Sequence, residues 1–156
     1  MGLDPVLGDD DSLYVSTEVA NAIRDELLPL ATYITPNRFE LAWLTGKPVS
    51  NKSDALIAAA SLPCNEVLAT SIRLDAGKVA TLAITRGEYA ETSSPVKPSV
   101  PHGTGDFLAG LYLAARLNGY EPREALKLSA AILETAISRS LGLPCLDIIG
   151  ALHNPS

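Results

Sequence analysis

The chain has 156 residues, of which 47% are hydrophobic and 19% are charged. This composition excludes a chain that is disordered throughout, because there is enough apolar surface to offset the entropy of the unfolded state. Twelve Lys and Arg against 18 Asp and Glu give a net charge of -6 and a pI near 4.8. An acidic chain repels phosphate backbones, so we expect no nucleic-acid partner, and a phosphate ligand would have to be held by backbone N–H groups or a metal.

The first half of the chain predicts three helices around one short strand. The helices cover residues 17–30, 38–44 and 54–62, and the strand covers residues 31–35. In the first helix a stripe of apolar residues recurs at helical spacing, at Val19, Ala22, Ile23, Leu27 and Leu30. Ser16 or Thr17 is the expected N-cap of the first helix and Ser53 that of the third, and Gly46 is expected to end the second.

The second half predicts three strands followed by two helices. The strands cover residues 67–72, 78–85 and 88–92, and the helices cover residues 107–117 and 122–140. Asp75, Ala76 and Gly77 form the expected turn between the first two strands, and residues 92–105 form a long irregular stretch with several prolines. Strands that alternate with helices predict an α/β fold, with the tail from about residue 141 left unassigned.

The cysteines and the start of the chain favour a cytoplasmic protein. Cys64 and Cys145 lack the spacing of a metal site, which is typical of two reduced thiols in the cytosol. The first residues lack the basic and apolar segments of a secretory signal. The longest apolar run, residues 107–115, is far shorter than the roughly 20 residues of a membrane span, so we expect no membrane partner.

Gly103, Thr104, Gly105 and Asp106 stand at the start of an apolar helix. Two glycines let the backbone approach a ligand closely, and the positive end of the helix dipole attracts a phosphate or the charge on a phosphoryl group in transfer. Asp106 would then lie beside the acceptor hydroxyl and take up its proton. The same residues also fit an ordinary helix start, with two turn glycines and an aspartate cap.

Asn37 and Glu40 lie three residues apart where the strand at 31–35 gives way to a helix. Open α/β sheets bind their ligands beyond the carboxyl ends of such strands. There Asn37 would contact phosphate, and Glu40 would orient water on a magnesium ion. Asn at the N-cap and Glu three residues later are also the two halves of a capping box, and both interpretations can hold together.

Asp4 and Asp9 enclose a short segment that continues into Asp10 and Asp11. Carboxylates just after a strand can bind a hard cation through oxygen. The alternative is a solvated acidic turn.

Thr70 and Ser71 stand at the expected end of the strand at 67–72. Their hydroxyls would meet a phosphate or a monovalent cation there. A strand end is also an ordinary place for threonine, so this pair adds to the other motifs and does not stand alone.

Taken in order, these motifs resemble the ribokinase-like superfamily. They are Asp-Pro-Val-x-Gly-Asp from Asp4, Thr-Pro-Asn-x-x-Glu from Thr35, Thr-Ser from Thr70 and Gly-Thr-Gly-Asp from Gly103. Within the superfamily, residues 3–9, 33–46 and 102–113 are most similar to pyridoxal kinases. The resemblance runs from residue 3 to about residue 140.

The resemblance implies a three-layer α/β/α fold that transfers the γ-phosphoryl group of ATP to the 5′-hydroxyl of pyridoxal, giving pyridoxal 5′-phosphate. It implies Mg²⁺, and K⁺ or Na⁺, as cofactors, pyridoxine and pyridoxamine as further substrates, and a homodimer. It places the catalytic base at Asp106 and an anion hole at Gly103, Thr104 and Gly105. The remaining implied contacts are to ATP, from Asp9, Asn37, Thr70 and Ser71, and to metal ions, from Asp4, Thr35, Glu40 and Thr70.

The resemblance also implies that the chain is one part of such an enzyme. Family proteins are longer, and the matched segments correspond to their carboxyl-terminal half, without the half that grips the pyridine ring. We therefore expect a single ATP-binding and catalytic portion over residues 1–156, with an incomplete sheet and an activity that the isolated chain need not retain. Three alternatives stay open: a hydroxymethylpyrimidine kinase, which typically has Cys in place of Asp106, a sugar kinase, and a non-catalytic nucleotide-binding remnant.

Overall fold

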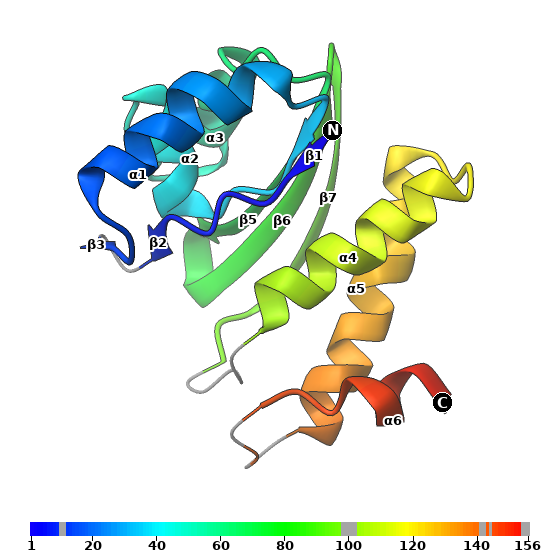
Figure 1. Cartoon of the computed structure of the whole chain (residues 1–156). Coiled ribbons are helices and arrows are strands. Elements are labelled where there is room, and N and C mark those ends of the chain that lie inside the picture. The colour runs from blue at the N-terminus through cyan, green and yellow to red at the C-terminus, as the bar shows by residue number, and fades with distance from the viewer. Residues whose placement is uncertain (10–11, 98–102, 141–142, 144, 154–156) are drawn as a thin grey trace. The chain divides into compact units, whose positions relative to one another are not determined.

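The computed structural model describes residues 1–9, 12–97, 103–140, 143 and 145–153. Within this part the chain forms two compact units, Met1–Pro95 and Val96–Ser156, called unit 1 and unit 2 below. Unit 1 carries the described strands and three α-helices, and unit 2 is helical (Figure 1). The predicted mixture of strands and helices is therefore confirmed, whereas a single catalytic portion over the whole chain stays a prediction.

Unit 1 is built on a five-stranded mixed sheet with the strand order β1-β4-β5-β6-β7. The strands are β1 (Gly2–Leu3), β4 (Tyr33–Ile34), β5 (Glu66–Leu74), β6 (Lys78–Thr85) and β7 (Glu88–Pro95). The neighbours β1, β4 and β5 run parallel, whereas β5, β6 and β7 pair antiparallel. The hairpin predicted from Asp75, Ala76 and Gly77 is confirmed, and β7 continues to Pro95 where the sequence predicted an end at Thr92.

Three α-helices lie on one face of this sheet: α1 (Thr17–Ala22), α2 (Arg38–Thr45) and α3 (Lys52–Ala60) (Figure 1). The core between helices and sheet is apolar and includes Ile34, Leu41, Ala55, Val67, Ala69, Ile72 and Leu82. The predicted helix at 38–44 is confirmed, and Gly46, with a φ of 65°, ends it in the left-handed conformation. Burial of its apolar face fixes the start of α2 directly after β4.

The prediction that the apolar stripe forms the buried face of the first helix is wrong. Val19 and Leu30 are 48% and 65% exposed, whereas Ala20 and Leu28 are buried. The helical stretch does run on to Leu30, but α1 passes into the π-helical turn η1 (Ile23–Leu27) and then the 3-10 turn η2 (Leu28–Leu30). Because a π turn takes in an extra residue, the buried face after it no longer follows the α-helical period.

Two further details of unit 1 differ from the sequence expectation. The N-cap of α3 is Asn51, not Ser53, because the Asn51 side chain accepts a 3.0 Å hydrogen bond from the Asp54 N–H. The second detail is a small antiparallel pair, β2 (Gly8–Asp9) with β3 (Ser12–Leu13), which the sequence did not predict. This pair gives the segment after β1 a fixed backbone.

Unit 2 contains α4 (Thr104–Leu117), α5 (Pro122–Arg139) and α6 (Ile148–His153). The predicted helices at 107–117 and 122–140 are confirmed, and α4 begins earlier than expected, at Thr104. Gly119, with a φ of 87°, lies in the turn between α4 and α5. Among the helices that the structure describes, none is long and apolar enough to cross a membrane.

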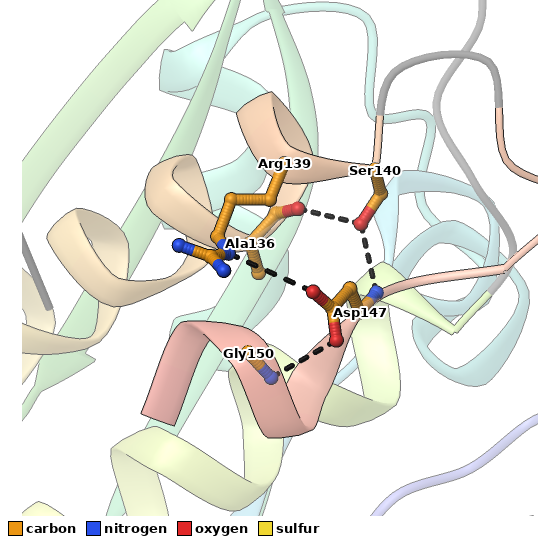
Figure 2. Close-up of polar contacts among 5 residues, drawn as sticks. All are labelled: Ala136, Arg139, Ser140, Asp147 and Gly150. Carbon is orange, nitrogen blue, oxygen red and sulfur yellow. Dashed lines mark hydrogen bonds and ion pairs between the residues drawn. The ribbon is translucent and has the colours of Figure 1, made fainter. Parts of the chain in front are cut away.

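A cluster of polar contacts joins the end of α5 to the start of α6 (Figure 2). The Ser140 hydroxyl is fully buried, donates to the Ala136 carbonyl at 2.6 Å and accepts the Asp147 N–H at 2.8 Å. The Asp147 carboxylate accepts the Gly150 N–H at 2.9 Å and lies 3.6 Å from Arg139 Nε. These contacts fix residues 147–150, in the tail that the sequence left unassigned, against the end of α5.

Candidate functional site

The carboxyl ends of β1 and β4 bring together several of the predicted site residues in unit 1. The Thr35 hydroxyl donates a 2.9 Å hydrogen bond to the Asp4 carboxylate, and the Thr35 N–H donates to the Leu3 carbonyl at 3.1 Å. Asn37 forms an isolated parallel bridge with Thr70 of β5. Residues 66 positions apart in sequence, from Asp4 to Thr70, therefore converge on one edge of the sheet, as the strand-end argument predicts.

The predicted capping box at the start of α2 is present. The Glu40 N–H donates to Asn37 Oδ1 at 2.9 Å, and the Asn37 N–H donates to Glu40 Oε2 at 2.9 Å. The same two side chains also contact the segment after β1: Leu7 N–H donates to Glu40 Oε1 at 2.7 Å, and Asn37 Nδ2 donates to the Gly8 carbonyl at 2.7 Å. Both carboxylate oxygens of Glu40 thus accept backbone N–H groups.

Glu40 is a buried acid, with 4% of its surface exposed. Burial raises the pKa of Glu40 above its ordinary value, and the nearby charge of Asp4 adds to this. The backbone N–H groups of Asn37, Leu7 and Gly8 act in the opposite direction, because they favour the ionised form, but they do not offset the burial. The side chain that was predicted to orient water on a magnesium ion is therefore engaged with protein backbone.

Thr70 and Ser71 do not end their strand, which corrects the sequence expectation. β5 continues to Leu74, and its pairing with β6 shifts register between Ala69 and Ile72. Ser71 has a φ of 58°, in the left-handed region, so the two residues form a bulge inside the strand. A bulge redirects side chains from the regular alternation of a strand, and the backbone of Thr70 at this bulge pairs with Asn37.

Asp9 lies in β2, is half-buried, and its carbonyl accepts a 3.3 Å hydrogen bond from the Ser12 hydroxyl. Asp4 is exposed, and Asp10 and Asp11 lie outside the described residues. Within the described ranges no group of three or more His, Cys, Asp or Glu side chains could hold a metal ion by itself. The carboxylates placed by the structure are thus Asp4 and Asp9, at the two ends of one short segment.

The start of α4 in unit 2 has a different character. Gly103 is the N-cap residue, with a φ of 89°, and no side chain of the described residues caps the helix. The Phe107 N–H is bonded to the Gly103 carbonyl at 3.0 Å, which begins the helical pattern. Asp106, in the first turn, is exposed. This start combines backbone N–H groups, the positive end of a 14-residue helix and an accessible carboxylate.

The predicted site residues are divided between the two units. Unit 1 holds those expected to contact ATP phosphates and metal, namely Asp4, Asp9, Thr35, Asn37, Glu40, Thr70 and Ser71. Unit 2 holds the predicted anion hole and base, from Gly103 to Asp106. The sequence motifs did not reveal the contacts of Leu7 and Gly8 with α2. The one sign of these contacts in the sequence was that the motifs at residues 4–9 and 35–40 each follow a predicted strand.

A surface pocket of about 440 Å³ in unit 1 contains none of these residues. It is lined by Ser50, Asn51, Lys52, Ser53, Arg73, Leu74, Asp75, Lys78 and Glu91. Lys52 and Glu91 form a 2.9 Å ion pair there. Cavity shape and motif chemistry therefore indicate different places on unit 1, and the motifs carry the argument because their residues are the ones brought together at the strand ends.

Comparison with known proteins agrees with the motifs. A family model described as phosphomethylpyrimidine kinase matches residues 2–147. A pyridoxal kinase of Rubrobacter xylanophilus is 34% identical over 146 residues, which cover 88% of this chain and 50% of that protein. The chain spans about half the length of the curated relatives it matches.

Solved structures give the same result for the fold. Pyridoxal kinase from Entamoeba histolytica matches 99% of this chain and 57% of its own, with a TM-score of 0.89 and 26% identity. Pyridoxal kinase from Leishmania donovani, in complex with ADP and pyridoxamine, matches 99% of this chain and 59% of its own, with a TM-score of 0.85 and 27% identity. The predicted ribokinase-like α/β fold is confirmed for the portion that is present.

Proposed function

The chain belongs to the pyridoxal kinase and phosphomethylpyrimidine kinase family, and we propose that it serves the ATP-dependent phosphorylation of the 5′-hydroxyl of pyridoxal. The observation that carries this proposal is the 34% identity to a pyridoxal kinase over nearly the whole chain. The uncapped, glycine-bounded start of α4, with an exposed carboxylate in its first turn, supports it chemically. Pyridoxine and pyridoxamine, bound in related structures, are the further substrates of the proposal.

In the proposed reaction the hydroxyl oxygen of pyridoxal forms a bond to the γ-phosphorus of ATP while the bond from that phosphorus to the β–γ bridging oxygen breaks. Asp106 accepts the hydroxyl proton, and ADP is the leaving group. The N–H groups of Gly103, Thr104 and Gly105 stabilise negative charge on the phosphoryl group in transfer. Since phosphoryl transfer depends chiefly on position and charge, these groups supply what the step needs without a covalent intermediate.

The nucleotide portion of the proposal rests on unit 1. Asp9, Asn37, Thr70 and Ser71 are its candidate contacts to the ATP phosphates. Magnesium bound with ATP would neutralise phosphate charge. Such an ion keeps several waters and is bound by one or two protein carboxylates together with the phosphates, which suits the few carboxylates at these strand ends. Asp4 is the exposed carboxylate of that set, and Glu40 holds the chain that follows Asp4 through its contact with the Leu7 N–H.

A monovalent cation, K⁺ or Na⁺, is the second ion of the proposal. Thr35 and Thr70 are its candidate ligands, because hydroxyl oxygens suit such an ion. Thr35 lies at the end of β4, and Thr70 pairs with Asn37 through the backbone, so both stand at the same edge of the sheet.

Hydroxymethylpyrimidine kinase is the second candidate, favoured by the description of the matching family model. Asp106 argues for pyridoxal, because the resemblance places a cysteine there in kinases of the other kind. The two candidates share the fold and the nucleotide, so only the acceptor substrate separates them.

The test is ADP release by the purified chain with Mg-ATP and one acceptor at a time: pyridoxal, hydroxymethylpyrimidine or ribose. We expect ADP release that depends on pyridoxal. Faster turnover of hydroxymethylpyrimidine would replace the first candidate with the second. Titration with a fluorescent ATP analogue runs alongside, and binding without turnover of any acceptor would identify the isolated chain as a nucleotide-binding remnant.

A further inference from the structure

Val6 has a backbone conformation that its side chain disfavours. Its φ is 46°, and a β-branched residue at positive φ is a genuine outlier. Val6 follows Pro5 in the segment of residues 4–9, the 4–9 segment, and its side chain is 54% exposed. Packing of the Val6 side chain therefore offsets little of the strain, and other contacts must hold the backbone in this shape.

The side-chain hydrogen bonds among those contacts come from the start of α2. Glu40 Oε1 accepts the Leu7 N–H at 2.7 Å across 33 positions of sequence, and Asn37 Nδ2 donates to the Gly8 carbonyl at 2.7 Å. The capping box fixes both side chains relative to each other. The two residues after the strained one are thus tied to a rigid helix by an acceptor and a donor.

Close packing and a backbone hydrogen bond also surround Leu7 and Gly8. A Cβ at Gly8 would lie 2.1 Å from the Ser12 carbonyl oxygen and 2.7 Å from a ring atom of Phe39. Leu7 is fully buried, and its carbonyl accepts the Tyr14 N–H at 2.8 Å. A strained segment that is held from several sides at once is typical of a functional site.

We propose that Asn37 and Glu40 are positioning residues, which hold the 4–9 segment in its strained shape and so fix where Asp4 and Asp9 stand. For Asn37 this role stands beside its proposed contact with phosphate, and for Glu40 it replaces the orientation of water on magnesium. Its consequence for nucleotide binding rests on the proposed function, whereas the bracing itself is a property of unit 1.

The test compares Glu40→Gln, Val6→Gly and the double variant with the wild-type chain. A Gln side chain has one acceptor oxygen, so it cannot accept both the Leu7 and Asn37 N–H groups as the carboxylate does. Hydrogen exchange at the Leu7 and Gly8 amides, measured by NMR without nucleotide, reports the segment. We expect Glu40→Gln to speed exchange there by at least about tenfold, and Val6→Gly to restore part of the protection by removing the strain.

Asp54→Asn is the matched control, because the Asp54 carboxylate accepts the Ser50 N–H at 2.9 Å at the start of α3 and its described hydrogen bonds are all with Ser50 and Asn51. It should leave exchange at Leu7 and Gly8 unchanged. Asn37→Ser keeps a capping oxygen but removes the donor to Gly8, so it tests the same role if Glu40→Gln fails to fold. We expect faster exchange at Leu7 and Gly8 in this variant as well.

Binding of ATP with and without Mg²⁺ completes the test. Positioning predicts that Glu40→Gln weakens ATP binding under both conditions and that the double variant binds more tightly than Glu40→Gln alone. Unchanged exchange in Glu40→Gln and Asn37→Ser would overturn the proposal, as would a binding loss confined to Mg²⁺ and not rescued by Val6→Gly. If the wild-type chain binds no ATP, the proposed function fails. The exchange rates still show whether Asn37 and Glu40 hold the 4–9 segment.

Discussion

The starts of α2 and α4 both carry predicted motif residues, yet their backbone N–H groups are treated in opposite ways. At α2, Asn37 and Glu40 satisfy each other's backbone N–H groups, and Glu40 is buried. At α4, Gly103 has positive φ, no described side chain caps the helix, and Asp106 is exposed. The start of α2 is capped by its own side chains, whereas the start of α4 has no side-chain cap among the described residues.

This difference shows that two helix starts with similar sequence signals can have different roles. The first N–H groups of any helix lack partners within the helix, and either side chains or a ligand must satisfy them. A capped start has little left for an anion and serves to hold neighbouring chain. An uncapped start behind a glycine keeps its N–H groups and its dipole available, which makes α4 the better place for a phosphoryl group.

The largest expected effect is that of Asp106→Asn, which tests the start of α4. We expect turnover of pyridoxal to fall by at least about 100-fold, or about 2.7 kcal/mol of barrier, because the amide cannot accept the hydroxyl proton. Affinity for the ATP analogue should change little, since the N–H groups of Gly103, Thr104 and Gly105 remain. Steady-state ADP release and analogue titration measure the two effects. Unchanged turnover would remove Asp106 from the role of base.

The capped start of α2 is tested by Asn37→Ala. The variant removes a cap and the hydrogen bond to Gly8, so we expect unit 1 to lose about 2 kcal/mol of unfolding free energy. Asn51→Ala, at α3, removes a cap that has no long-range partner and should cost about 1 kcal/mol. Urea unfolding followed by the fluorescence of Trp43, the single tryptophan, reports unit 1 in both variants. Equal losses would mean that the Gly8 contact adds nothing.

The start of α4 is also tested by Gly105→Ala. Apart from its chain neighbours and the adjacent backbone of α4, no described heavy atom lies within 4 Å of the position that a Cβ would take at Gly105, so the helix should keep its stability. The methyl group would instead hinder close approach of an anion, and we expect ATP affinity to fall about tenfold, the scale of one lost hydrogen bond to a charged group. Gly110→Ala, equally open and further along α4, is the matched control and should leave affinity unchanged. Equal affinities in the two variants would count against an anion site at this turn.

Local signals in the sequence predicted much of this comparison. The Asn37 and Glu40 spacing predicted the capping box, Gly46 predicted the end of α2, and the Asp75 turn predicted the β5–β6 hairpin. Each of these depends on residues within a few positions of one another, where propensity and hydrogen bonding act directly. The start of α4 was predicted less well: the sequence placed the first helical residue at Phe107 with Asp106 as a possible cap, whereas Gly103 is the N-cap and the helix begins at Thr104.

The features that sequence reasoning missed depend on distant or irregular structure. The hydrogen bond from Leu7 to Glu40 joins positions 33 apart, and no local pattern announces it. The π turn after Ala22 shifted the buried face of the stretch that follows it, because the stripe was read at the α-helical period throughout. The bulge at Thr70 and Ser71 was read as a strand end for the same reason: a regular pattern was assumed.

The smallest expected effect concerns the pH dependence of the capped start of α2. Burial raises the pKa of Glu40 in the folded chain above the ordinary 4.5. The folded state then binds a proton more tightly than the unfolded state, so the contribution of Glu40 to the free energy of unfolding falls as pH rises from about 4.5 through the raised pKa, and is constant above it.

Urea unfolding of the wild-type chain and Glu40→Gln across that pH window isolates this contribution together with its coupling to Asp4, because titrating groups that do not interact with Glu40 cancel in the difference. A falling difference means that burial outweighs the backbone N–H groups, so that ionisation of Glu40 in the folded chain lowers the free energy of unfolding. Such a cost is expected of a residue retained to position the 4–9 segment. A difference that rises with pH would show the reverse: the N–H groups of Leu7, Gly8 and Asn37 would outweigh burial, and Glu40 would stabilise unit 1 as an anion in its own right.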